Sequence, residues 1–176
     1  NFIVDPKIGV YVFFFGIAAA VQAMVDVLVV TRYYPSLVKS VQEKNKDKIK
    51  SSFALFKKKM SVYNVFLYIL SIPSCYIVIL MTGKQEYVHL FYWYIIIVAA
   101  NMLTNMSMPY HYILYAMKKD VLIVIVNIIC LLVFIAFSFV GIAMYSEWKM
   151  LPIILSLLIS SAIMFVVKKY LYFKEV

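Results

Sequence analysis

One carboxylate stands inside a long apolar stretch of the sequence. Asp26 is the only acidic residue between Ile8 and Val30, and Gln22 lies four residues before it, on the same face of a helix. A charged side chain at the centre of a bilayer costs at least about 2.5–3.5 kcal/mol, so it normally faces a bundle interior or water. Asp26 could therefore bind a cation or a headgroup, or carry a coupling proton. It could equally lie near the cytoplasmic interface, where its side chain would reach water or pair with Arg32.

Two asparagines form a second polar group. Asn101 and Asn105 are four residues apart in the apolar stretch 89–109, so they share one face of a helix. Pro109 would bend this helix and free backbone carbonyls, which a transport path could use. The same amides could instead only make hydrogen bonds between helices, worth about 0.6 kcal/mol on average. The candidates for contact with a substrate or a coupling ion are Gln22, Asp26, Arg32, Asn101 and Asn105.

No arrangement of residues predicts catalysis, a metal site or a cofactor. His89 and His111 are isolated in the sequence. Cys75 and Cys130 lie in apolar stretches, where free thiols behave as small apolar side chains. The four glycines form neither a phosphate-binding loop nor a dinucleotide fingerprint. We expect no enzymatic activity, no catalytic residue, no metal and no cofactor.

The elements that position the candidate residues follow from composition. Hydrophobic residues make up 65% of the 176 residues and charged residues 14%, against roughly 45–50% and about 25% in soluble domains. A chain of this size cannot bury so much apolar surface in water, so the sequence predicts an all-α integral membrane protein. Because apolar runs of about 18 residues or more mark spanning helices, we predict five spans in one membrane domain. They lie at about 8–30, 60–82, 89–109, 121–145 and 150–167.

Basic residues gather on alternate connections between these spans. Nine lie in the long loop 31–59, two in the turn after the third span and three in the tail. Cytoplasmic loops carry the excess of Lys and Arg, so we expect an external N-terminus and a cytoplasmic C-terminus. The net charge of +9 thus follows membrane sidedness and does not predict binding to nucleic acid.

The basic loop 31–59 is predicted to contain a helix of its own. Pro35 is expected to end the first span, because proline disfavours helix at the residue before it. Asn45 or Asp47 could then cap a new helix. Apolar residues recur at helical spacing over 49–60, which predicts an amphipathic helix that leads into the second span. Its lysines could dock on anionic headgroups, or they could serve only to fix the topology.

Several short motifs follow one another along the chain. They are Ile8-Gly9-Val10-Tyr11, Pro35-Ser36-Leu37, the lysine-rich segment 43–50, Ile72-Pro73, the segment 83–87 and the segment 114–119. Their order, spacing and sidedness resemble the C-terminal part of a polysaccharide flippase, a member of the multidrug/oligosaccharidyl-lipid/polysaccharide exporter superfamily. The resemblance covers nearly the whole chain.

This resemblance implies a transporter of 12 to 14 helices in two bundles, of which the chain would be the C-terminal bundle. It implies flipping of lipid-linked oligosaccharide or polysaccharide repeat units by alternating access, in the cytoplasmic membrane of a bacterium or archaeon. The implied partners are the lipid-linked glycan, membrane lipids and the N-terminal bundle of the same full-length chain. Because the chain begins at Asn1 and not at Met, it is expected to be a fragment.

Two other functions stay open. One is an ion-coupled drug antiporter of the same superfamily, in which Asp26 would be the coupling acid. The other is a membrane assembly subunit without transport activity, whose basic loop recruits a partner or anionic lipid.

Overall fold

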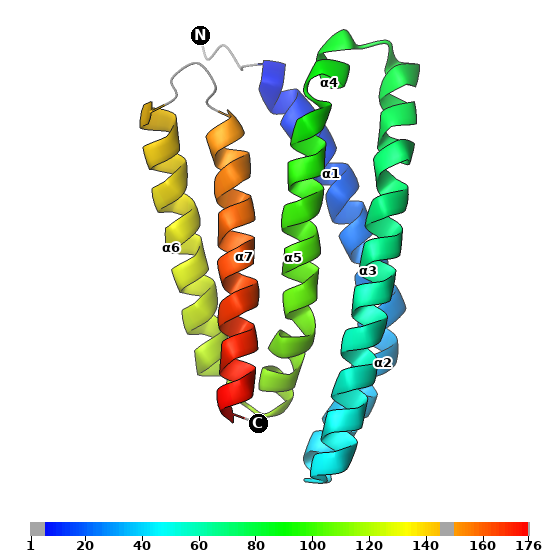
Figure 1. Cartoon of the computed structure of the whole chain (residues 1–176), viewed down its shortest axis with the longest axis vertical. Coiled ribbons are helices and arrows are strands. Elements are labelled where there is room, and N and C mark those ends of the chain that lie inside the picture. The colour runs from blue at the N-terminus through cyan, green and yellow to red at the C-terminus, as the bar shows by residue number, and fades with distance from the viewer. Residues whose placement is uncertain (1–5, 145–149, 176) are drawn as a thin grey trace.

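The computed structural model describes residues 6–144 and 150–175 and forms an all-α bundle (Figure 1). Within these ranges, five helices are long and apolar enough to cross a membrane, and no strand occurs. This confirms the predicted class, an all-α protein with several membrane spans. Tyr145, the predicted last residue of the fourth span, lies outside the described residues.

The first spanning helix is continuous and longer than predicted. It consists of α1, the π-helical turn η1 and α2, at Pro6–Val25, Asp26–Val30 and Thr31–Gln42. The expectation that Pro35 ends the span is wrong, because the helix runs through it. An interior proline costs about 3 kcal/mol, but Leu37 is fully buried with Phe53 and Phe56 of the next helix. Packing of α2 against that helix therefore outweighs the tendency of Pro35 to end the helix.

The second spanning helix begins inside the basic loop. α3 (Lys46–Thr82) has 37 residues, about 55 Å at 1.5 Å per residue, against a hydrocarbon core of about 30 Å. Asn45 caps it, since its Oδ1 accepts hydrogen bonds from the backbone N–H groups of Asp47 and Lys48, each at 3.1 Å. The predicted cap at Asn45 is thus confirmed, as is the helix that leads into the second span.

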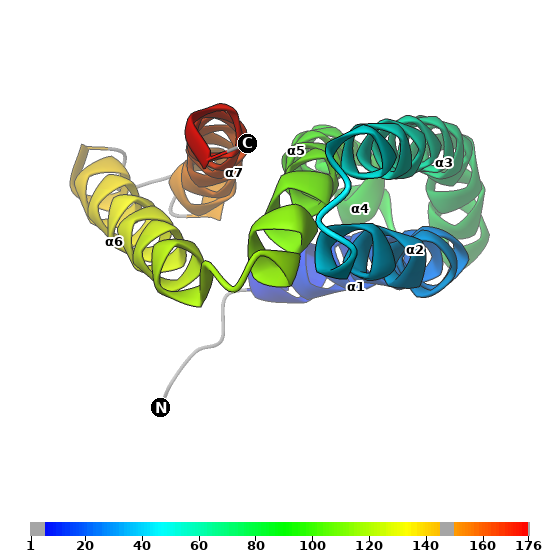
Figure 2. The same cartoon turned by 90° about the horizontal axis from the view of Figure 1, so that it is seen from below.

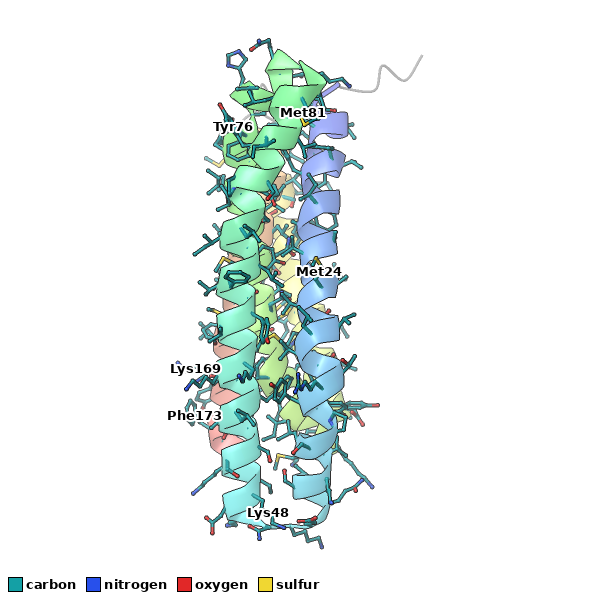
Figure 3. The ribbon with its side chains drawn as sticks, turned by 90° about the vertical axis from the view of Figure 1, so that its right-hand side faces the viewer. Met24, Lys48, Tyr76, Met81, Lys169 and Phe173 are labelled. Carbon is teal, nitrogen blue, oxygen red and sulfur yellow. The ribbon has the colours of Figure 1, made fainter. Side chains whose placement is uncertain are left out.

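α2 and the first turns of α3 form a helical hairpin. Figure 1 shows this hairpin extending past the ends of the other helices, and in Figure 3 Lys48 lies well beyond Phe173 of the last helix. The hairpin therefore stands along the bundle axis. At its tip, the Lys48 ammonium donates a hydrogen bond to Glu43 at 2.7 Å. This bond holds the pKa of the Glu43 carboxyl below its usual value.

The rest of the chain adds one short helix and three spanning helices. α3 ends at Gly83, whose φ of 67° is a left-handed conformation that glycine adopts without steric cost. The helices that follow are α4 (Gln85–His89), α5 (Phe91–Ala116), α6 (Asp120–Met144) and α7 (Met150–Glu175). α5 and α7 run past the predicted ends at 109 and 167, because polar and aromatic side chains continue both helices beyond their apolar parts. α5 passes through Pro109 and changes direction in its last third (Figure 1).

The helices divide into two groups, which we call the body and the arm. The body contains α1, α2, α3, α4 and α5, and the arm is the hairpin of α6 and α7. Figure 2 shows α5 between the other body helices and the arm. α7 meets the body mainly along α5, whereas α6 packs mainly on α7. The α5–α7 seam is therefore the principal joint between body and arm.

The basic connections lie at one end of the bundle. The tip of the α2–α3 hairpin, the α5–α6 turn and the C-terminal end of α7 share this end (Figure 1). We call it the basic end, and the end that carries α4 the opposite end. This arrangement matches the predicted alternation of basic and non-basic connections.

Candidate functional site

A buried polar cluster joins three helices of the body. Asn105 of α5 donates through Nδ2 to Oδ1 of Asn64 on α3 at 3.2 Å, and to the Tyr68 hydroxyl at 3.5 Å. Asn64 donates to the backbone carbonyl of Met102 at 3.0 Å. The Tyr68 hydroxyl donates to the backbone carbonyl of Ala18 on α1 at 3.4 Å. Asn64, Tyr68 and Asn105, which we call the polar cluster, are fully buried.

Two oxygens at or near the polar cluster accept no hydrogen bond from the described residues. Both amide nitrogens and the Tyr68 hydroxyl already donate to groups of the bundle. Oδ1 of Asn105 is buried and has no hydrogen-bond partner among the described residues, and the same holds for Oδ1 of Asp26. A buried acceptor without a donor costs about 1–3 kcal/mol. These two oxygens therefore suit a hydrogen-bond donor such as water or a substrate hydroxyl, or a coupling proton on Asp26.

Asp26 opens the π-helical turn η1 and lies near the polar cluster. It interacts electrostatically with Tyr68 of α3 and with Tyr112 of α5, so its carboxyl faces the interior of the body. π-Helical turns inside α-helices are frequent at functional sites. The alternative pair with Arg32 is not formed. Arg32 is exposed, and its guanidinium lies 5.8 Å from the ring centroid of Tyr33.

The other two predicted residues flank this site. Gln22 is half-buried, one helical turn before Asp26. Asn101 is buried one turn before Asn105, and its Nδ2 has no hydrogen-bond partner among the described residues. The structure thus brings Asp26 and Asn105 toward Tyr68, keeps Gln22 and Asn101 a turn away, and leaves Arg32 outside.

Sequence reasoning missed two members of the site. Asn64 and Tyr68 lie four residues apart, both on the buried face of α3 that also carries Met60. This spacing could have identified Asn64 from the sequence. An amide that shares a helix face with buried apolar residues needs a hydrogen-bond partner inside the bundle. The partner itself, Asn105, could be found only from the packing of α3 on α5.

A second row of polar side chains joins α5 to α7. Thr104 donates through Oγ1 to Oγ of Ser161 at 3.0 Å. Two turns further along both helices, Lys168 Nζ lies 3.5 Å from Nδ1 of His111. Both pairs are 57 residues apart in sequence, so α5 and α7 run parallel in a constant register. Neither His111 nor Lys168 was a candidate from sequence.

An apolar groove lies between the two helices of the arm. It has a volume of about 670 Å³ and is lined by α6 residues such as Phe137 and α7 residues such as Leu155. Its polar group, the hydroxyl of Ser156, already hydrogen-bonds to Ser138 at 2.6 Å. The groove therefore suits hydrocarbon and offers little to a polar ligand.

Comparison of the chain with models of protein families, with curated proteins and with solved structures finds no match.

Proposed function

We propose that this chain is one helical bundle of a transporter that flips lipid-linked oligosaccharide or polysaccharide repeat units by alternating access. The observation that carries the proposal is the polar site in which the buried Oδ1 of Asp26 lies near the buried Asn64, Tyr68 and Asn105. Uncompensated polar groups are expensive in a membrane and mark substrate and ion pathways. The order of motifs from Ile8-Gly9-Val10-Tyr11 to the segment 114–119 supports the same function.

The surface of the bundle fits a partner bundle and a lipid carrier. Between 22% and 44% of the most apolar stretch of each spanning helix is buried, so much apolar surface is available to lipids and to further helices. The glycan would contact the polar site, while the polyprenyl tail would stay in the bilayer. In this arrangement the N-terminal bundle of the same full-length chain would close the other side of the path.

The membrane is the cytoplasmic membrane of a bacterium or archaeon in this proposal, with the basic end inside. The bases at this end include the exposed Lys39, Lys44 and Lys46 of the hairpin. The positive-inside rule places such loops in the cytoplasm. The opposite end, with α4, would face the outside.

Deletion and complementation of the gene for the full-length protein test the proposal. Deletion is expected to abolish surface polysaccharide and to leave lipid-linked repeat units on the inner face. Asn105→Leu in the full-length chain is expected to lower export about tenfold, equivalent to about 1.4 kcal/mol, because an amide of the polar site is lost. Asn127→Leu is the matched control, since Asn127 is exposed on α6. Normal surface polysaccharide in the deletion strain would refute the proposal.

The orphan carboxyl oxygen of Asp26 favours a second candidate function, an ion-coupled antiporter of the same superfamily. In that function the carboxylate would bind a proton or a cation and release it as the bundle changes conformation.

A further inference from the structure

Lys168 is buried where a lysine would normally reach water. It follows the apolar part of α7 at the basic end, and lysines at helix ends usually extend toward the interface. Its neighbour Lys169 does so and points outward (Figure 3). Lys168 instead is 2% exposed, with Nζ 3.5 Å from Nδ1 of His111. A cation is thus held inside the α5–α7 seam.

With Lys168 in its charged form, the geometry of this pair requires a neutral imidazole. A lysine ammonium has three donors and no acceptor. Nδ1 of His111 must therefore accept the hydrogen bond, which leaves the ring proton on Nε2. No carboxylate lies within ion-pair distance of Lys168 among the described residues, where the ion pair found is Lys48 with Glu43. The lone pair of His111 is therefore the contact that retains the ammonium in the seam.

An acidic group faces His111 from another helix. Asp120, the first residue of α6, interacts electrostatically with the imidazole. Other titratable side chains lie around this pair. Cys130 of α6 interacts with Lys168, the Tyr112 ring lies edge-on to the imidazole at 5.4 Å, and Tyr34 of α2 interacts with Asp120. The imidazole is therefore placed between a cation on α7 and an anion on α6.

We propose that His111 is a pH-sensitive latch between the body and the arm. When neutral, it accepts the hydrogen bond from Lys168 and holds α7 on α5. When protonated, it loses its acceptor, repels the Lys168 ammonium and is attracted to Asp120. Asp120 follows α5 after a short turn and stays close to it, so the contact that opens is the one to α7.

His111 and Lys168 lie toward the basic end of the α5–α7 seam. The α5–α7 seam is the principal joint between body and arm. Besides the His111–Lys168 contact, its basic end has ring contacts of Tyr110 on α5 with Phe165 and Tyr172 on α7, and Tyr172 also stacks on Phe53 of α3 at 4.4 Å. Loss of the His111 hydrogen bond would therefore remove the polar contact at this end, so that α7 could shift against these aromatic rings while the Thr104–Ser161 hydrogen bond holds the seam two turns away.

Spin-label distances on the full chain in lipid nanodiscs test the latch. Labels replace two exposed residues, Leu55 on α3 and Tyr170 on α7, after the native cysteines are changed to alanine. The pH is lowered from about 8 to about 4, below the ordinary histidine range, because burial and the Lys168 ammonium both oppose protonation of His111. Over this range the body–arm distance is expected to shift by at least about 2 Å, the size of a segment rearrangement. The shift should vanish in His111→Gln, which accepts a hydrogen bond but does not titrate.

Two matched controls come from the chain itself. His89 is the other histidine and is exposed on α4, so His89→Gln should keep the shift. Lys168→Met should abolish the shift, whereas Lys169→Met should keep it. A wild-type distance that is constant with pH, or a shift that persists in His111→Gln, overturns the proposal.

Nuclear magnetic resonance of the ring-labelled wild-type chain gives a second test that needs no variant. With two histidines in the chain, two imidazole signals are expected. At about pH 8, the end of the range where imidazole is neutral, the buried signal should show the Nε2–H tautomer. A Nδ1–H tautomer there would contradict the proposed contact with Lys168.

Discussion

Asp26 is a carboxylate for which the surrounding helices provide no donor. Its Oδ1 is buried without a hydrogen-bond partner among the described residues, and the nearby aromatic groups, Tyr68 and Tyr112, are neutral. A residue that only stabilised the fold would be expected to have a partner, because burial without one is unfavourable. Its presence at a π-helical turn therefore favours a functional role over a structural one.

Asp26→Asn is therefore expected to lower transport without lowering stability. In the full-length chain, Asp26→Asn is expected to lower ion-driven transport about tenfold or more, a loss of about 1.4 kcal/mol, and to remove its pH dependence. The same change should leave the thermal stability equal or higher, because it removes a half-buried charge whose Oδ1 has no hydrogen-bond donor among the described residues. Transport assays in vesicles and thermal unfolding of the purified protein measure the two effects.

Glu86→Gln is the control for this prediction. Glu86 is an exposed carboxylate on α4, far from the polar site, so its neutralisation should change neither quantity. If Asp26→Asn leaves transport and its pH dependence unchanged, Asp26 is not the coupling acid, and the antiporter function loses its support.

At the level of single residues, the sequence identified groups by type and missed their partners. Asp26 and Asn105 stand out because charged or amide side chains are rare in apolar stretches. Lys168 does not stand out, because it begins a run of bases that topology alone explains. Its inward orientation depends on His111, 57 residues away in sequence, and no local pattern records that contact.

At the level of elements, packing overrides some local preferences and depends on others. Pro35 lies inside α2 because Leu37 packs on α3, whereas the cap at Asn45 forms as its residue type predicts. α6 and α7 of the arm approach each other closely where Gly141 faces Pro152. A Cβ built on Gly141 of α6 would lie 2.5 Å from Cβ and 3.3 Å from Cγ of Pro152 on α7.

Gly141→Ala is therefore expected to destabilise the arm. The proline ring is rigid, so the helices must separate, and such overpacking costs about 1–3 kcal/mol. Gly16→Ala is the matched control. No atom lies within 4 Å of a Cβ built on Gly16 in α1, so alanine should be neutral or stabilise the helix by about 0.5–1 kcal/mol. Unfolding in mixed micelles compares both variants with the wild type, and equal stability of all three would contradict the packing at Pro152.

At the level of the whole molecule, apolar length determined the number of spans but left their arrangement open. α6 is apolar on nearly all faces, so its sequence contains no stripe that shows which side meets α7. In a bilayer, helix association is driven by small residues and polar pairs and not by hydrophobicity itself. The division into body and arm therefore rests on contacts such as Ser138–Ser156 and Thr104–Ser161, which link helices across the chain.

The segregation of charge gives the molecule a predicted orientation that labelling can measure. Lys46 at the hairpin tip and Gln85 at the opposite end are both exposed, and the native Cys75 and Cys130 are buried and free. In a full-length chain with both native cysteines changed to alanine, Gln85→Cys in intact cells should react with a membrane-impermeant maleimide. Lys46→Cys should react only after the membrane is permeabilised, because the excess of bases keeps its end inside. The reverse pattern would place the basic end outside, and the proposed glycan path would then open to the wrong compartment first.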